Sequence, residues 1–91
     1  MHVLKLWREL GDDHEVAETL RLISAAESML GLCKEGIQRG KEALAIYEQL
    51  NDKSGQARSH QLLASLFHYD NQLDAAEGAA SRAIDLSVEG N

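Results

Sequence analysis

The stretch LKLWRELGD at residues 4–12 is matched in chemical type forty residues later by LAIYEQLND at residues 44–52. An aromatic residue stands at the same place in both stretches, Trp7 in one and Tyr47 in the other. Each stretch ends in Gly or Asn followed by Asp, a combination typical of one helix closing and the next beginning. This forty-residue period indicates a structure built from stacked repeats.

Gly or Asn also recurs every twenty residues, at positions 11, 31, 51, 71 and 91. Both residues tolerate the left-handed backbone that closes a helix at its C′ position. The spacing leaves room for a helix of about sixteen residues and a short turn. Because the chain has no proline and carries apolar residues at helical spacing, we expect helices at about 14–29, 33–50, 55–69 and 73–89.

Several residues predict details of these helices. Asp12 or Asp13 is expected to cap the start of the first, and Ser54 the start of the third. Gly36 and Gly40 each cost about 1 kcal/mol relative to alanine inside a helix, which predicts a close approach by a neighbouring helix as compensation. The fourth helix is expected to turn one stripe inward, made of Leu73, Ala76, Ala80, Ala83, Ile84 and Ser87.

Composition narrows the classes of partner and compartment. Ninety-one residues make one small domain at most, and 15 acidic against 9 basic residues give a net charge of −6 that disfavours nucleic acid as a partner. A single cysteine, Cys33, cannot form an internal disulfide and fits a reducing compartment, so a cytoplasmic location is expected. The sequence shows no signal peptide and no stretch that predicts a membrane partner.

Catalytic and metal chemistry is not expected. The segment His14-Glu15-Val16-Ala17-Glu18 is one residue away from a zinc-protease helix motif, but its fifth position lacks the second imidazole. His60 and His68 lie about 12 Å apart along one predicted helix, too far to share a metal ion. No nucleophile–base arrangement or phosphate-binding glycine loop is present in the sequence, so we expect no cofactor and no enzymatic activity.

The two units show one further pattern when they are aligned. The later unit reads His60, Leu63-Ala64-Ser65-Leu66-Phe67, Ala76, Ala80, Ala83, and the earlier reads Leu20, Ile23-Ser24-Ala25-Ala26-Glu27, Gly36, Gly40, Ala43. This pattern resembles the tetratricopeptide repeat, in the forty-residue variant of kinesin light chains, spindle-orientation adaptors and the repeat tails of signalling receptors. Glu27 departs from it, because the family usually buries an aromatic residue there, and HEAT-like hairpins remain an alternative at this period.

The resemblance implies an all-α fold, a right-handed superhelix of stacked antiparallel helical hairpins. Residues 1–10 would be the second half of a preceding repeat's second helix, 11–50 one repeat and 51–91 another, as a fragment of a longer array. Its concave wall would be formed by the first helix of each unit. The peptide-binding positions carried over from the family are Glu18, Arg21, Leu22, Ala25, Met29, Arg58, Gln61, Leu62, Ser65, His68 and Tyr69.

These positions predict a protein-interaction scaffold for a peptide or a helical segment. Ala25 and Ser65 stand where the family's carboxylate clamp has asparagine, so a clamp for chaperone tails is not expected. The alternative function is a structural spacer or a self-associating module, joined end to end or by exchange of hairpins. Its apolar end faces would be Val3, Leu4 and Trp7 at one end and Leu73, Ile84 and Leu86 at the other.

Overall fold

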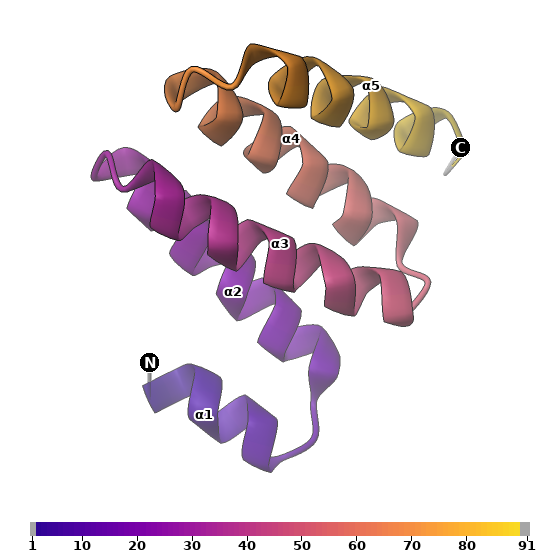
Figure 1. Cartoon of the computed structure of the whole chain (residues 1–91). Coiled ribbons are helices and arrows are strands. Elements are labelled where there is room, and N and C mark those ends of the chain that lie inside the picture. The colour runs from indigo at the N-terminus through magenta and orange to yellow at the C-terminus, as the bar shows by residue number, and fades with distance from the viewer. Residues whose placement is uncertain (1, 90–91) are drawn as a thin grey trace.

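The computed structural model describes residues 2–89, and it describes side chains from residue 5 onward. This part of the chain is all-α and contains no strand, as the sequence predicts (Figure 1). The helices are α1 (His2–Glu9), α2 (Asp13–Met29), α3 (Cys33–Gln49), α4 (Lys53–Tyr69) and α5 (Leu73–Glu89). The last four have 17 residues each and lie within two residues of the predicted bounds.

Each of the first four helices ends at a residue with left-handed backbone. Gly11, Gly31, Asn51 and Asn71 have φ values of 71°, 78°, 55° and 60°. The next residue donates its backbone N–H to the carbonyl five residues earlier, as Asp12 does to Trp7 at 3.0 Å and Gln72 does to Phe67 at 2.7 Å. This pair of features is the Schellman motif. The twenty-residue punctuation in the sequence therefore sets where each of these helices stops.

Aspartate caps the start of both α2 and α4. Asp12 Oδ1 accepts the backbone N–H of Glu15 at 3.2 Å, and Asp52 Oδ1 accepts that of Gly55 at 3.0 Å. The prediction for Asp12 is confirmed, whereas the prediction of Ser54 as the second cap is wrong. Helix α4 begins at Lys53, so Ser54 lies inside its first turn and Asp52 holds the capping position.

The helices pack as an open layer. Each helix packs closely on the next one along the chain, and α2 also approaches α4, whereas within residues 2–89 no Cα atom of α5 lies within 8 Å of one in α3 or α2. A closed four-helix bundle would bring α2 against α5. The described part measures 37 × 33 × 15 Å, and its shortest dimension is about that of two layers of packed helices. Helices α2 and α4 form one layer, and α1, α3 and α5 form the other (Figure 1).

One core cluster joins α2 to α3. Val16, Ala17 and Leu20 from α2 pack against Ala43 and Tyr47 from α3, and all five side chains are buried. Trp7 of α1 packs against this cluster while remaining half-buried, so α1 is held at the first half of α2. Val3 and Leu4, which the end-stacking alternative used, lie outside the residues whose side chains are described.

A second core cluster joins α3, α4 and α5, and its buried members are Ile37, Leu63, Leu66, Phe67 and Ala79. Gly36 and Gly40 let α4 approach closely, because a Cβ atom built on either would lie 2.9 Å from a methyl carbon of Leu66 or Leu63. The close helix approach predicted from these two glycines is therefore present.

The fourth helix differs from its prediction. Ala83 is buried as expected and Ala76 is half-buried against the second core cluster, but Leu73, Ala80, Ile84 and Ser87 are exposed. The exposure of Leu73 and Ile84 agrees instead with the apolar end face of the alternative function, whereas Leu86, the third residue of that face, is buried together with Ala79. Much of the predicted stripe lies on a side of α5 that no other described helix covers.

Candidate protein-interaction surface

The eleven predicted contact residues all lie on α2 and α4, the two helices of one layer. They do not form one continuous surface. The structure separates them into a hydrogen-bonded pair, a set of exposed apolar side chains, and two grooves between α4 and α5. Ala25 is half-buried and lies outside both grooves.

Glu18 and Arg21 form the hydrogen-bonded pair, and both are bound to the protein itself. Tyr47 of α3 donates its hydroxyl to Glu18 Oε1, and Arg21 Nη2 donates to Glu18 Oε2 at 3.2 Å. The Tyr47 side chain is fully buried, so this hydrogen bond fixes α2 against α3. The resemblance placed Glu18 and Arg21 among the peptide-binding positions, and in the structure they are hydrogen-bonded within the protein.

The electrostatics of this pair follow from burial and hydrogen bonding. Burial raises the pKa of Tyr47 to about 12, and the negative charge of Glu18 adds to the effect. The hydrogen bond from Tyr47 lowers the pKa of Glu18 below its usual value, with a further contribution from Arg21. At neutral pH the site therefore holds a neutral phenol, a carboxylate and a guanidinium. This arrangement stabilises the packing of α2 on α3.

Exposed apolar side chains form the second group. Leu22 is 59% exposed, Met29 is 88% exposed and Tyr69 is 70% exposed. Leu62, another of the predicted contact residues, is less exposed than these three, because it is half-buried and packs against the second core cluster. Exposed apolar side chains mark a protein-binding surface where they form one contiguous patch, whereas single ones are ordinary.

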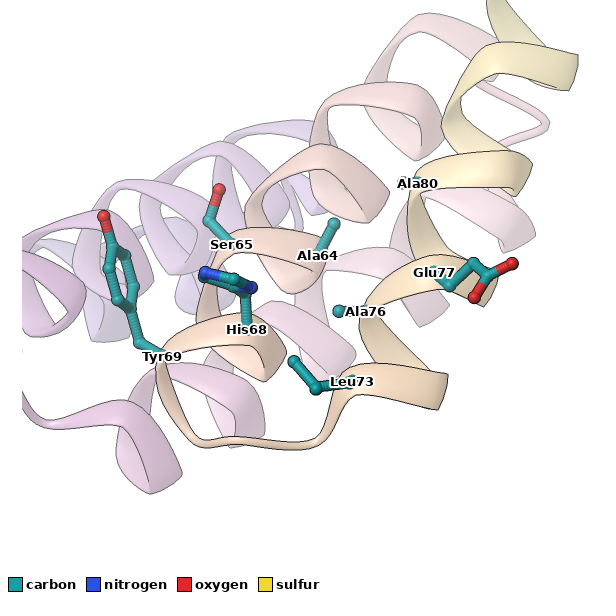
Figure 2. Close-up of a pocket in the computed structure, with 8 residues that line it drawn as sticks. All are labelled: Ala64, Ser65, His68, Tyr69, Leu73, Ala76, Glu77 and Ala80. Carbon is teal, nitrogen blue, oxygen red and sulfur yellow. The ribbon is translucent and has the colours of Figure 1, made fainter.

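A groove between the end of α4 and the start of α5 holds three of the predicted residues (Figure 2). We call it the α4–α5 groove; its volume is about 420 Å³. From α4 it is lined by Ala64, Ser65, His68 and Tyr69. From α5 it is lined by Leu73, Ala76, Glu77 and Ala80.

The α5 wall of this groove was missed by the sequence reasoning. Ala76 and Ala80 were assigned to the core because of their helical spacing, Leu73 was assigned both to the core and to an apolar end face, and Glu77 was not assigned at all. The signal was present, since the spacing identified a real apolar stripe. What the spacing could not show is whether another element covers that stripe.

A second groove, of about 650 Å³, lies between the first half of α4 and the end of α5. Arg58 and Gln61 from the predicted set line it, together with Lys53. Lys53 Nζ lies 3.9 Å from Glu89 Oε2, so part of the positive charge here is paired across the groove. This site is more polar than the α4–α5 groove and suits the backbone or acidic side chains of a peptide.

The surroundings of His14 and His60 are those of residues that contribute to packing. His14 Nε2 lies 3.6 Å from Asp52 Oδ2, and its ring stands edge-on to Tyr47 with centroids 6.2 Å apart, so it links α2 to the turn before α4. His60 is half-buried, and burial lowers its pKa, with a smaller contribution from Arg82. Among the described residues no group of three or more His, Cys, Asp or Glu side chains could hold a metal ion.

In the part of the chain that the structure covers, no helix is both long and apolar enough to cross a membrane. Comparison with protein-family models, with curated proteins and with solved structures gives no match. The resemblance to the tetratricopeptide repeat therefore depends only on the residues quoted above.

Proposed function

We propose that this chain is a non-catalytic interaction scaffold that binds a peptide or helical segment of another protein through α2 and α4. The proposal includes a cytoplasmic setting and a tetratricopeptide-type stacking of the two helix pairs, with α2 and α4 as the inner wall. Within residues 2–89, Cα atoms of α2 and α4 lie within 8 Å of each other, whereas those of α3 and α5 do not. This difference supports a layer that curves with α2 and α4 on its inner side.

The observation that carries this function is the exposure of large apolar side chains on that layer. Leu22, Met29 and Tyr69 keep more than half of their surface in water. They belong to helices whose other faces are buried in the two core clusters. Covering them with a partner removes apolar surface from water at about 25 cal/mol per Å².

The test is a selection followed by measured affinities. A displayed library of peptides of mixed sequence is selected against the folded chain, and the isolated peptides are titrated by fluorescence anisotropy. Leu22→Glu is expected to weaken the selected peptides by about tenfold or more, because it places a charge in an apolar contact. Leu22 is exposed, so the variant should remain folded, which circular dichroism checks.

Val88→Glu provides the matched control. Val88 is 71% exposed on α5, so the same charge is added to a comparably exposed aliphatic position outside α2 and α4. Equal losses for the two variants would contradict a site on α2 and α4. So would selected peptides whose affinity is unaffected by Leu22→Glu.

The second candidate function, a spacer or self-associating module, is favoured by the outer side of α5. Leu73, Ile84 and Val88 are exposed there. A homo-oligomer formed through this side would bury them, and sedimentation at increasing concentration would show it. Ile84→Glu should then dissociate the oligomer, whereas Leu22→Glu should leave it intact.

A further inference from the structure

The α4–α5 groove has a filled counterpart elsewhere in the same chain. Moving its lining residues back by forty positions replaces Leu73, Ala76 and Ala80 with Cys33, Gly36 and Gly40. These counterparts lie on α3, and α4 packs directly on them. A Cβ atom at Gly36 or Gly40 would meet Leu66 or Leu63 of α4, and Cys33 packs against the core cluster that contains both leucines.

The wall formed by α4 shows the same correspondence. Ala64 of the groove corresponds to Ser24 of α2, which is fully buried. Ser24 donates its hydroxyl to the Gly36 carbonyl at 2.6 Å, and its Oγ would lie 3.4 Å from a Cβ at Gly40. Both walls of the groove therefore correspond to a surface on which a helix packs, which we call a helix seat. In the counterpart, α4 occupies that seat.

From this correspondence we infer that the α4–α5 groove binds a partner helix that is amphipathic and basic, in the way that α2 and α3 bind α4. The inference rests on the proposed function and specifies one part of that surface. The occupant is defined by the residues of α4 that fill the counterpart seat. It carries aliphatic side chains at positions i and i+3, as Leu63 and Leu66 do, and a basic side chain at i+4.

The basic side chain is required by a difference between the two seats. Glu77 of the groove stands where the counterpart has Ile37, which belongs to one core cluster with Phe67 of α4. An occupant with an apolar ring at the Phe67 position would bury the Glu77 carboxylate without a partner. Lysine or arginine at that position instead pairs with it, and the net charge of −6 also attracts a basic helix.

The size of the aliphatic side chains is also limited. Ala76 and Ala80 carry the Cβ atoms that Gly36 and Gly40 lack, and such atoms would come within 2.9 Å of the leucine methyl carbons in the α4 arrangement. The occupant must therefore lie a few tenths of an ångström further out, or use a shorter side chain such as valine.

A second copy of the chain does not meet these requirements. Its α2 is the forty-residue counterpart of α4, so docking by α2 would place Glu27 at the Phe67 position, beside Glu77. Two carboxylates at one apolar contact repel each other. In addition, α1 corresponds to residues 82–89, so a copy stacked in this register would bring its α1 into the space of the second half of α5.

The probe for the test is taken from the chain itself. A fluorescein-labelled peptide copies residues 53–72 with Phe67→Lys, and a second peptide carries Phe67→Glu. The lysine peptide is expected to bind the wild-type chain, and Glu77→Lys should weaken it by about three- to tenfold, because an attraction becomes a repulsion. The glutamate peptide should show the opposite preference, with tighter binding to Glu77→Lys.

Two further variants localise the binding. Asp85→Lys makes the same charge change at an exposed position of α5 outside the groove and should leave the affinity of the lysine peptide nearly unchanged. Ala80→Phe fills the groove from an exposed position and should abolish binding. The comparison of the two peptides on wild type and Glu77→Lys also detects a peptide that displaces α4 from its own position. Such a peptide would bind next to Ile37 and would not respond to the charge at position 77.

The outcomes separate this inference from the proposed function. Failure of the lysine peptide to bind the wild-type chain, or equal effects of Glu77→Lys and Asp85→Lys, would overturn the inference. If peptides selected from the library are weakened by Leu22→Glu but not by Ala80→Phe, the scaffold function stands and the helix seat does not. A concentration-dependent dimer that Glu77→Lys dissociates would assign the groove to a second copy and would also overturn the inference.

Discussion

Alanine substitutions at four helical glycines form a graded test of the packing between α3 and its neighbours. Replacing glycine with alanine in a helix interior favours folding by about 1 kcal/mol when nothing else changes, mainly because the unfolded chain loses freedom. The packing cost depends on what the added Cβ atom meets. In this chain the answer differs at Gly78, Gly36, Gly40 and Gly55.

Gly78 and Gly55 are the two extremes. A Cβ at Gly78 has nothing within 4 Å, so Gly78→Ala should stabilise the chain by about 0.5–1 kcal/mol. At Gly55 the added atom would overlap Cδ1 of Tyr47 and lie 2.5 Å from Cε1 and 2.6 Å from Cγ. The ring can move aside only by giving up its hydrogen bond to Glu18 and its buried position. Overpacking of this kind, with the hydrogen bond lost, should cost about 2–4 kcal/mol.

Gly36 and Gly40 are intermediate. The nearest atoms are the ends of leucine side chains at 2.9 Å, which can shift, so the packing cost should nearly cancel the helix-propensity gain of about 1 kcal/mol. Gly36→Ala should be slightly the worse of the two, because the Ser24 backbone carbonyl also lies 3.3 Å from the added atom.

Thermal and urea unfolding followed by circular dichroism measure the series. For a chain of this size 1 kcal/mol corresponds to about 4–8 °C in Tm, so Gly78→Ala should raise Tm by a few degrees and Gly55→Ala should lower it by about 10 °C or more. Equal Tm values for Gly55→Ala and Gly78→Ala would refute the placement of Tyr47 over the start of α4. Since that placement joins the two helix pairs, the packing described above would fail with it.

Four other substitutions test single interactions, one of them as a control. Tyr47→Phe removes the hydrogen bond to Glu18 and should lower the free energy of unfolding by about 1.5–3 kcal/mol in urea titrations at pH 7, with a smaller loss in acid, where the carboxylate is protonated. The lowered pKa of His60 means that the unfolded chain binds more protons than the folded chain, so stability should decrease as pH falls below about 6.5; His60→Gln should reduce that dependence in pH-resolved urea unfolding. Asp52→Ala should cost about 1 kcal/mol through loss of the α4 cap, whereas Ser54→Ala should change stability little, and a reversed order in thermal unfolding would contradict the observed cap.

The helix boundaries were predictable because local chemistry determines them. A glycine or asparagine at C′ acts within its own turn, so its position in the sequence is enough to place the end of a helix. The capping error at Ser54 has a local cause as well. The alignment that matches Asp12 with Asp52 already contained the right cap, but serine two residues later satisfied the same general preference.

The role of Glu18 could not be predicted in the same way. Its hydrogen-bond partner Tyr47 is 29 residues away on another helix. A family position that points toward a ligand and one that points toward a neighbouring helix differ by a fraction of a helical turn, which periodicity does not resolve. Only the packing of α2 on α3 shows that this carboxylate is already bound.

The error on α5 is of another kind, and it is informative about function. The spacing of Leu73, Ala76 and Ala80 follows the same rule that placed Cys33, Gly36 and Gly40 in contact with α4, and it identified the correct side of the helix. Helix α4 covers the first set, whereas in the second set Leu73 and Ala80 are exposed and Ala76 is half-buried against the second core cluster. A sequence pattern reports the chemistry of a face, whereas burial also needs an occupant. The mismatch between an inward-type stripe and an exposed groove therefore marks a place where a partner helix can complete the packing.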